Sequence, residues 1–204
     1  MKAKQLDTLV EKLNGYLLLN KACDLGISKS YVQEYIKKNN FERVAHGLYK
    51  SADVWTDELY IVALKNEKIV YALDTALMLH GLTEREPASI YATVSRSYNA
   101  SHLIKNRIIV NYVREEWLDL GRTIVKTTYG NEVPVYDMER TICDLVRVKD
   151  KKDPQMFAYA MKEYAKSSSK NLPRLMTYAK EFGIEAEIRQ YMEVLLWLSK
   201  HQDS

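Results

Sequence analysis

The first fifty residues contain apolar positions at helical spacing, separated by short polar breaks. Four of these positions predict an amphipathic helix over residues 2–13, namely Leu6, Leu9, Val10 and Leu13. Asn20 can cap a second, short helix that ends at Gly26, and Ser28 can cap a third helix that continues to Asn39. Two short helices joined by a tight turn at a glycine predict a helix-turn-helix.

The helix that Ser28 opens carries a polar stripe. Lys29, Gln33 and Lys37 are spaced four residues apart and therefore share one face of the helix. Ser30 and Tyr31 extend this stripe near the N-terminal end, where recognition helices meet base edges. Lysine and serine suit phosphates, and glutamine can bind adenine in the major groove. The same stripe also fits the solvated face of an ordinary helical hairpin, so the helix pair alone leaves both interpretations open.

The residues that follow favour DNA binding. Residues 41–50 predict two short strands around a tight turn at His46-Gly47, and such a hairpin directly after a recognition helix is the wing of a winged helix. We therefore expect residues 1–55 to form a winged helix-turn-helix DNA-binding domain. The expected contacts with the major groove and the flanking backbone are made by Ser28, Lys29, Ser30, Tyr31, Gln33, Lys37, Arg43, His46 and Lys50.

The remainder, residues 56–204, mixes short β-like segments with helical ones. Strands are expected at residues 90–94, 108–113, 123–128 and 133–136. Helices are expected at residues 57–64, 74–80, 138–148 and 185–198, with two more opening at Pro154 and Asn171. The predicted fold class is α+β, with an N-terminal winged helix-turn-helix and a C-terminal domain that ends in helices.

Composition places the chain among folded proteins. Of its 204 residues, 47% are hydrophobic and 28% are charged, which excludes a disordered chain. No apolar run is long enough to span a bilayer, and the N-terminus lacks the apolar core of a signal peptide. The two cysteines lie far apart, which excludes a disulfide framework. We expect an intracellular, cytoplasmic protein that contacts no membrane.

The distribution of charge is more informative than its sum of +3. Residues 1–55 hold nine basic and six acidic side chains, whereas residues 56–204 hold 21 of each. Within that balanced part, residues 87–114 contain no acidic residue but do contain three tyrosines and four cations, namely Arg96, Lys105, Arg107 and Arg114. Such a stretch suits a nucleic-acid backbone or an RNA surface, so it is a candidate second basic surface. Pairing with acids elsewhere in the fold explains it equally well.

Signals of catalysis are weak. The chain has no glycine-rich phosphate loop and no dinucleotide fingerprint, and its four histidines have no metal-ligand spacing. Asp137, Glu139 and Asp144 leave open a metal-dependent nuclease. However, Asp137 as a helix N-cap and Glu139 in the first turn explain the first two acids. We expect no enzyme, no catalytic residue, no metal and no cofactor.

Three segments, in this order, carry a resemblance to a known family. Glu42–Tyr49 has the form Glu-Arg-Val-x-x-Gly-x-Tyr, and Ala76–Leu82 is similar to Ser-Ala-Leu-x-Leu-His-Gly-Leu. Val135–Asp144 has the form Val-Tyr-Asp-x-Glu-Arg-Thr-x-x-Asp. Together they resemble the AbiEi-type antitoxins of bacterial abortive-infection systems. The chain departs from that pattern at Asp74-Thr75, where His-Glu-Ser is commoner.

The resemblance implies two functions for one chain. The winged helix would repress its own operon by binding inverted repeats in the promoter. The C-terminal domain would neutralise a toxin that resembles nucleotidyltransferases without forming a stable complex with it, the type IV arrangement of phage defence. On this basis we expect a monomer that pairs on DNA. The alternative is a winged-helix regulator whose C-terminal domain senses a ligand or oligomerises and has no toxin partner.

Overall fold

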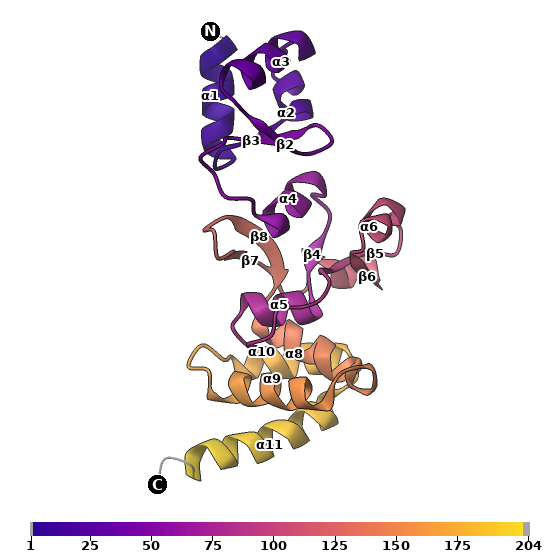
Figure 1. Cartoon of the computed structure of the whole chain (residues 1–204). Helices are drawn as coiled ribbons and strands as arrows, with labels where there is room; N and C mark the ends of the chain where they lie inside the picture. Colours follow the sequence, from indigo (N-terminus) through magenta and orange to yellow (C-terminus); the bar gives the residue numbers. More distant parts are fainter. Residues whose placement is uncertain (1, 202–204) are drawn as a thin grey trace. The chain divides into compact units, whose positions relative to one another are not determined.

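The computed structural model describes residues 2–201, and it divides the chain into two compact units (Figure 1). The first unit runs as far as Glu67 and also includes the separate segment Lys126–Glu132. The second unit consists of Lys68–Val125 and the chain from Val133 onward. The sequence predicts a boundary after residue 55, which is too early and misses the separate segment. The reason is that the next helix and the tip of a later hairpin pack into the first unit.

The first unit consists of four helices and a small sheet. In chain order these are α1 (Lys2–Lys12), β1 (Tyr16–Leu18), α2 (Leu19–Asp24), α3 (Lys29–Lys38), β2 (Glu42–Ala45), β3 (Leu48–Lys50) and α4 (Glu58–Lys65). The strands form an antiparallel sheet in the order β1-β3-β2. The three expected helices and the hairpin before residue 55 are therefore confirmed as elements. Strand β1 was not expected.

Apolar side chains from α1, β1, α2 and α3 form the core of the first unit. Its fully or nearly fully buried members are Leu6, Leu17, Ala22, Ile27, Val32 and Ile36. The turn after α1 needs a glycine, because Gly15 has a φ of 86° and an added Cβ would lie 2.3 Å from Val54 Cγ2. Gly26, the predicted end of the second helix, also has a positive φ, 75°.

A buried carboxylate joins the two chain segments of the first unit. Asp57 caps α4 by accepting a hydrogen bond from the Tyr60 amide at 3.1 Å. Its second oxygen accepts from Thr127 Oγ1 at 2.6 Å and from Asn131 Nδ2 at 2.8 Å. Asn131 in turn accepts from Asn14 Nδ2 at 3.0 Å. Because burial makes an unpaired carboxylate costly, these donors explain why Lys126–Glu132 belongs to this unit.

The second unit has a five-stranded mixed sheet and a helical layer. Its elements are β4 (Val70–Tyr71), α5 (Leu73–Leu79), β5 (Tyr91–Ser95), α6 (Ser101–Lys105), β6 (Ile109–Val113), α7 (Glu115–Leu118), β7 (Arg122–Lys126), β8 (Glu132–Tyr136), α8 (Met138–Arg147), a short 3-10 helix (Lys149–Lys151), α9 (Pro154–Lys166), α10 (Leu172–Glu181) and α11 (Glu185–His201). The strand order is β6-β5-β4-β8-β7. Strands β5 and β6 are parallel, as are β4 and β8, whereas β4 and β5 are antiparallel. The α+β class is confirmed.

The core of the second unit lies mainly among its C-terminal helices. Figure 1 shows α8, α9, α10 and α11 gathered on one side of the sheet, with α5 between the sheet and these helices. Helix α8 is buried from Glu139 to Val146 and contacts α5, α9, α10 and α11. The sequence predicts these helices to within a few residues. It misses α6 and α7, which are too short to show a helical period.

Candidate nucleic-acid interface

The turn between α2 and α3 is built from two residues that the sequence indicates. Gly26 adopts a φ of 75°, which lets the chain reverse directly after α2. Ser28 caps α3, because its hydroxyl accepts a hydrogen bond from the Tyr31 amide at 3.4 Å. The Ser28 side chain is thus engaged at the helix start while remaining exposed.

Helix α3 presents its polar stripe to solvent. Val32 and Ile36 are buried against the core, while Lys29, Ser30, Gln33 and Lys37 are all exposed. The helical period puts the two sets on opposite faces, so the expected exposure of the stripe is confirmed. The described residues include no ion-pair partner for Lys29 or Lys37. Two cations and one amide therefore face outward along one helix.

Tyr31 is only partly available to a partner. Its ring is half-buried against the core of the first unit, and Lys2 Nζ lies 5.8 Å from the ring centroid. The residue therefore contributes to packing as well as to the exposed face. Its position one residue after Ser30 turns it toward α1.

The β2–β3 hairpin presents three exposed polar residues, of which Arg43 and His46 are basic and Glu42 is paired with Lys50. Arg43 and His46 are both exposed, and Gly47 takes the positive φ of 69° that the tight turn requires. The His46 carbonyl accepts a hydrogen bond from Lys65 Nζ at 2.6 Å, which ties the turn to α4. The predicted turn at His46-Gly47 is confirmed.

Lys50 does not belong among the DNA contacts, which corrects the expectation. Its side chain is 7% exposed, and Nζ lies 2.8 Å from Glu42 Oε2 and donates to the Val54 carbonyl at 2.8 Å. Side chains alternate across a strand, so Lys50 points to the same side as the fully buried Leu48. An ammonium held by these internal acceptors is not available to a phosphate.

The same alternation identifies a residue that sequence reasoning missed. Tyr49 lies between the two inward-facing residues of β3, and its hydroxyl accepts a hydrogen bond from Gln33 Nε2 at 3.4 Å. This contact connects α3 to the hairpin, and the half-buried Tyr49 ring packs against the core of the first unit. The two-residue period of β3 makes Tyr49, and not Lys50, the residue of this strand that lies on the side opposite to Leu48.

The four cations of the candidate second basic surface are exposed in the second unit. Arg96 follows β5, Lys105 ends α6, Arg107 precedes β6 and Arg114 follows it. Arg114 lies 3.8 Å from Glu116 Oε1, and its guanidinium lies 4.6 Å from the Trp117 ring centroid. For the other three, the described part of the chain contains no ion-pair partner within 4 Å. The structure thus brings all four cations to one edge of the sheet.

The acids of the nuclease alternative are occupied by internal partners. Asp137 caps α8, and its burial raises the pKa of its carboxyl. Glu139 accepts from Tyr164 Oη at 3.1 Å and from the Asn171 amide at 2.8 Å, and Asp144 pairs with Arg140 at 2.9 Å and with Arg147 at 3.0 Å. Among the described residues, no group of three or more His, Cys, Asp or Glu side chains could hold a metal.

Arg140 shows that this acidic segment is built for packing. It is fully buried between the Tyr136 and Phe182 rings, at 4.2 and 4.6 Å from their centroids. Its Nη1 donates to the carbonyls of Trp117 and Leu120. His80 Nε2 lies 2.7 Å from the Tyr136 carbonyl. Two of the three family-like segments therefore meet in the core of the second unit.

A polar cavity of about 280 Å³ lies between α5 and the start of α9. Lys152 Nζ pairs with Asp74 inside it and lies 4.3 Å from the Tyr91 ring centroid. Arg85 pairs with Asp153 at the rim at 2.8 Å. Because these charges are already satisfied by one another, the cavity favours no particular ligand.

Comparison with known proteins shows the fold alone. No protein-family model matches the chain, and no curated protein does. The crystal structure of the RV2827C protein from Mycobacterium tuberculosis is similar, with a TM-score of 0.60 and 9% sequence identity. The similarity covers 95% of this chain and 75% of that one. Across the described residues, each helix is too short or too polar to cross a membrane.

Proposed function

We propose that the first unit is a winged helix-turn-helix that binds duplex DNA. The observation that carries this proposal is the exposed stripe of α3, two cations and an amide, next to an exposed hairpin. A helix of this kind fits the major groove, and a hairpin beside it can reach the flanking phosphates. The order of helices and strands from α1 to β3 supports the same assignment.

The side chains of α3 and the hairpin have separate roles in this proposal, and Ser28 and Ser30 lie near the phosphates at the start of α3. Lys29 and Lys37 contact phosphates, while Gln33 reads a base edge. Arg43 and His46 contact the backbone beside the site. Tyr49 holds Gln33 in place through its hydroxyl before DNA arrives. This set replaces the one that included Lys50.

We further propose that the chain is an autorepressing antitoxin of an AbiE-like, type IV toxin–antitoxin system. Its DNA site would be inverted repeats in its own promoter, where two monomers pair. Its functional partner would be a nucleotidyltransferase-like toxin, neutralised without a stable complex. Support comes from the three family-like segments, two of which pack against each other through His80 and Tyr136.

Promoter binding by point variants tests the DNA-binding part. Lys37→Ala removes one phosphate contact, so it should weaken binding at every sequence and reduce the magnitude of the salt slope by about one. Gln33→Ala should relax specificity at one base pair by roughly 1–3 kcal/mol. Gel-shift titration at several salt concentrations measures both effects. Lys162→Ala, an exposed lysine on α9, is the matched control and should bind like wild type. Unchanged binding by both α3 variants would show the α3 assignment to be wrong.

Co-expression tests the antitoxin part. The full chain should restore growth to cells that express the neighbouring nucleotidyltransferase-like toxin. A Gln33→Ala/Lys37→Ala chain should restore growth equally, because neutralisation is assigned to the second unit, yet it should no longer repress a promoter reporter. Repression without growth rescue would favour the plain regulator with a ligand-sensing or oligomerising C-terminal domain.

A further inference from the structure

Strand β6 is the outer strand of the second unit's sheet, and its surroundings are basic. It pairs only with β5 in the strand order β6-β5-β4-β8-β7. Residues 87–114, which include both strands and α6, contain no acidic residue. We name the four cations around β6 together with Tyr112 the basic edge; they are Arg96, Lys105, Arg107 and Arg114.

The cations lie at both ends of β6. The Arg96 amide donates to the Val113 carbonyl at 2.9 Å, which places Arg96 beside Arg114 where the two parallel strands end. Arg107 lies at the opposite end, two residues before the first residue of the strand, and Lys105 ends the neighbouring helix α6. A strand of five residues is roughly 16 Å long at about 3.3 Å per residue. The edge can therefore follow an extended polyanion over several repeating units.

Three of these charges have no counter-charge in the described part of the chain. Arg96, Lys105 and Arg107 make no ion pair there, whereas Arg114 is loosely paired with Glu116 and stacked on Trp117. Glu115 and Glu116 lie at the Arg114 end, so the uncompensated charge is strongest at Lys105 and Arg107. Unpaired surface cations of this density favour an anionic partner.

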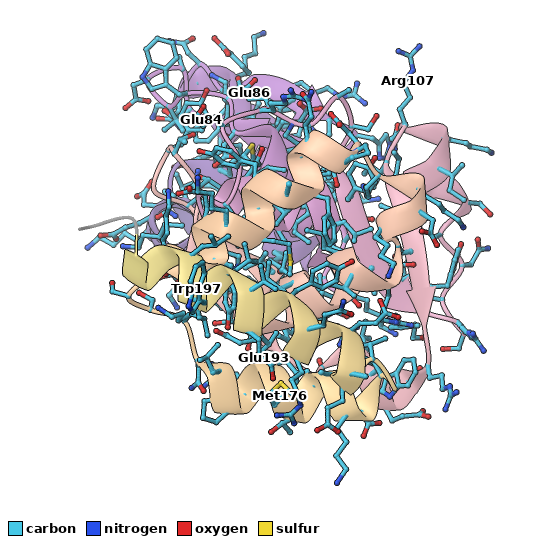
Figure 2. All side chains as sticks on the ribbon, turned by 90° about the horizontal axis from the view of Figure 1, so that it is seen from below. Glu84, Glu86, Arg107, Met176, Glu193 and Trp197 are labelled. Atoms are coloured by element: carbon cyan, nitrogen blue, oxygen red, sulfur yellow. The ribbon has the colours of Figure 1, made fainter. Side chains whose placement is uncertain are left out.

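Arg107 lies in the hydrogen-bonded turn that ends α6, where its amide donates to the Ile104 carbonyl at 3.0 Å. Arg107 has a φ of 60°, a left-handed conformation that a residue with a Cβ adopts reluctantly. Glycine or asparagine would suit this position better. Figure 2 shows the Arg107 side chain pointing away from the ribbon into open space. The turn thus holds the Arg107 guanidinium in an exposed position.

Aromatic exposure indicates which polyanion fits. Tyr112 on β6 is 42% exposed, and Tyr98 stacks edge-on with His102 at 5.9 Å in the loop that leads into α6. In a duplex the base faces are covered by stacking, so an exposed tyrosine gains little from it. Unpaired bases offer their faces to aromatic rings and to arginine planes. Cations at both ends of a strand with a tyrosine between them match a single strand.

We propose that the basic edge binds single-stranded RNA. The phosphates contact Lys105, Arg107 and Arg96, and a base stacks on Tyr112. This is the manner in which proteins hold unpaired RNA loops and ends. The activity is separate from promoter binding by the first unit and does not depend on it.

Fluorescence anisotropy with the full chain and a labelled, unstructured 12-nucleotide RNA tests the proposal. Lys105→Gln/Arg107→Gln should weaken binding and reduce the magnitude of the salt slope by about 1.4, at about 0.7 per phosphate contact. Tyr112→Ala should weaken binding by about 5- to 160-fold and leave the salt slope unchanged. Lys162→Gln/Lys180→Gln, which removes two exposed lysines from α9 and α10, should bind like wild type.

Three results would overturn the proposal. The first is absence of RNA binding by the wild-type chain, which would point to an acidic protein as the partner. The second is equal RNA binding by wild type and by both basic-edge variants. The third is equal competition by DNA of the same sequence, single-stranded or duplex. Because all the altered side chains are exposed, the variants should melt at the temperature of wild type, and thermal melting checks that they are folded.

The outcome can be separated from that of the promoter experiment. Gln33→Ala/Lys37→Ala should lose promoter binding and retain RNA binding. The basic-edge variants should retain promoter binding. RNA binding that is lost only in the α3 variant would assign it to the first unit and contradict the basic edge.

Discussion

At the scale of single residues, the segment Val135–Asp144 shows how a motif of charged residues can be mainly structural. Asp137, Glu139 and Asp144 all accept hydrogen bonds from within the fold, and Arg140 is buried between two rings. Gly121 has a φ of 78° and makes room for Arg140, because an added Cβ would lie 2.6 Å from the Arg140 Cβ. An acid-rich segment with a nuclease-like spacing therefore organises the core of α8.

Asp137 gives a pH-dependent prediction. Its burial raises the pKa of its carboxyl, so the folded state binds the proton more tightly than the unfolded state. Stability from this group is present at low pH and is lost as pH rises from the ordinary aspartate pKa through the raised one. Asp137→Asn keeps a good N-cap and removes that loss. As pH rises above the ordinary aspartate pKa, the free energy of unfolding of Asp137→Asn should increase relative to that of wild type, as measured by urea denaturation.

Asp153 provides a control of opposite sign. It also caps a helix, α9, but its hydrogen bond from the Gln155 amide lowers the pKa of its carboxyl. Its stabilisation is present above the ordinary aspartate pKa and is lost as pH falls. The free energy of unfolding of Asp153→Asn should therefore fall relative to that of wild type as pH rises. If both variants changed in the same direction, the explanation by burial of Asp137 would be wrong.

At the scale of elements, long periodic segments are predictable and short ones are not. The helices from α8 to α11 each repeat apolar residues over ten or more positions and are predicted with nearly correct ends. Strand β1 consists of three consecutive buried residues. A run this short shows no alternation of apolar and polar positions, so the sequence does not reveal it as a strand. The exposed face of α3 was predictable because Val32 and Ile36 fix its orientation. The prediction that Lys50 contacts DNA was wrong because side chains alternate across β3, which turns the Lys50 side chain inward.

The β7–β8 hairpin tip gives a prediction at the same scale. Asn131→Ala removes a donor to the buried Asp57 carboxylate and the contact with Asn14. Because the buried Asp57 carboxylate then has one donor fewer, the free energy of unfolding of the first unit should fall by about 1–3 kcal/mol. Hydrogen exchange should accelerate in α4 and α1, while the amides of α8 stay unchanged. Thr128→Ala alters an exposed residue of the same tip and should have no such effect. Uniform acceleration throughout the chain would contradict the assignment of this tip to the first unit.

At the scale of the whole molecule, the fold class was predictable, but the division of the chain was not. A similar fold over 95% of the chain at 9% identity shows that this architecture forms from sequences that share few identical residues. The discontinuous first unit depends on the hydrogen bonds from Thr127 and Asn131 to Asp57, whose partners are separated by 70 and 74 positions in the sequence. A local sequence pattern cannot predict contacts over such separations. The four cations of the candidate second basic surface come from one sequence segment, and only the sheet topology shows that this segment includes the outer strand β6.

The discontinuity of the first unit has a consequence during synthesis. Asp57 leaves the ribosome well before Thr127 and Asn131, the donors that satisfy its carboxylate. At about 5–20 residues per second, translation of the intervening chain takes on the order of several seconds. Over that interval α3 belongs to an incomplete unit. A nascent or prematurely terminated chain therefore lacks the hydrogen bonds that satisfy the Asp57 cap of α4, and the first unit is completed only after much of the second unit has been made.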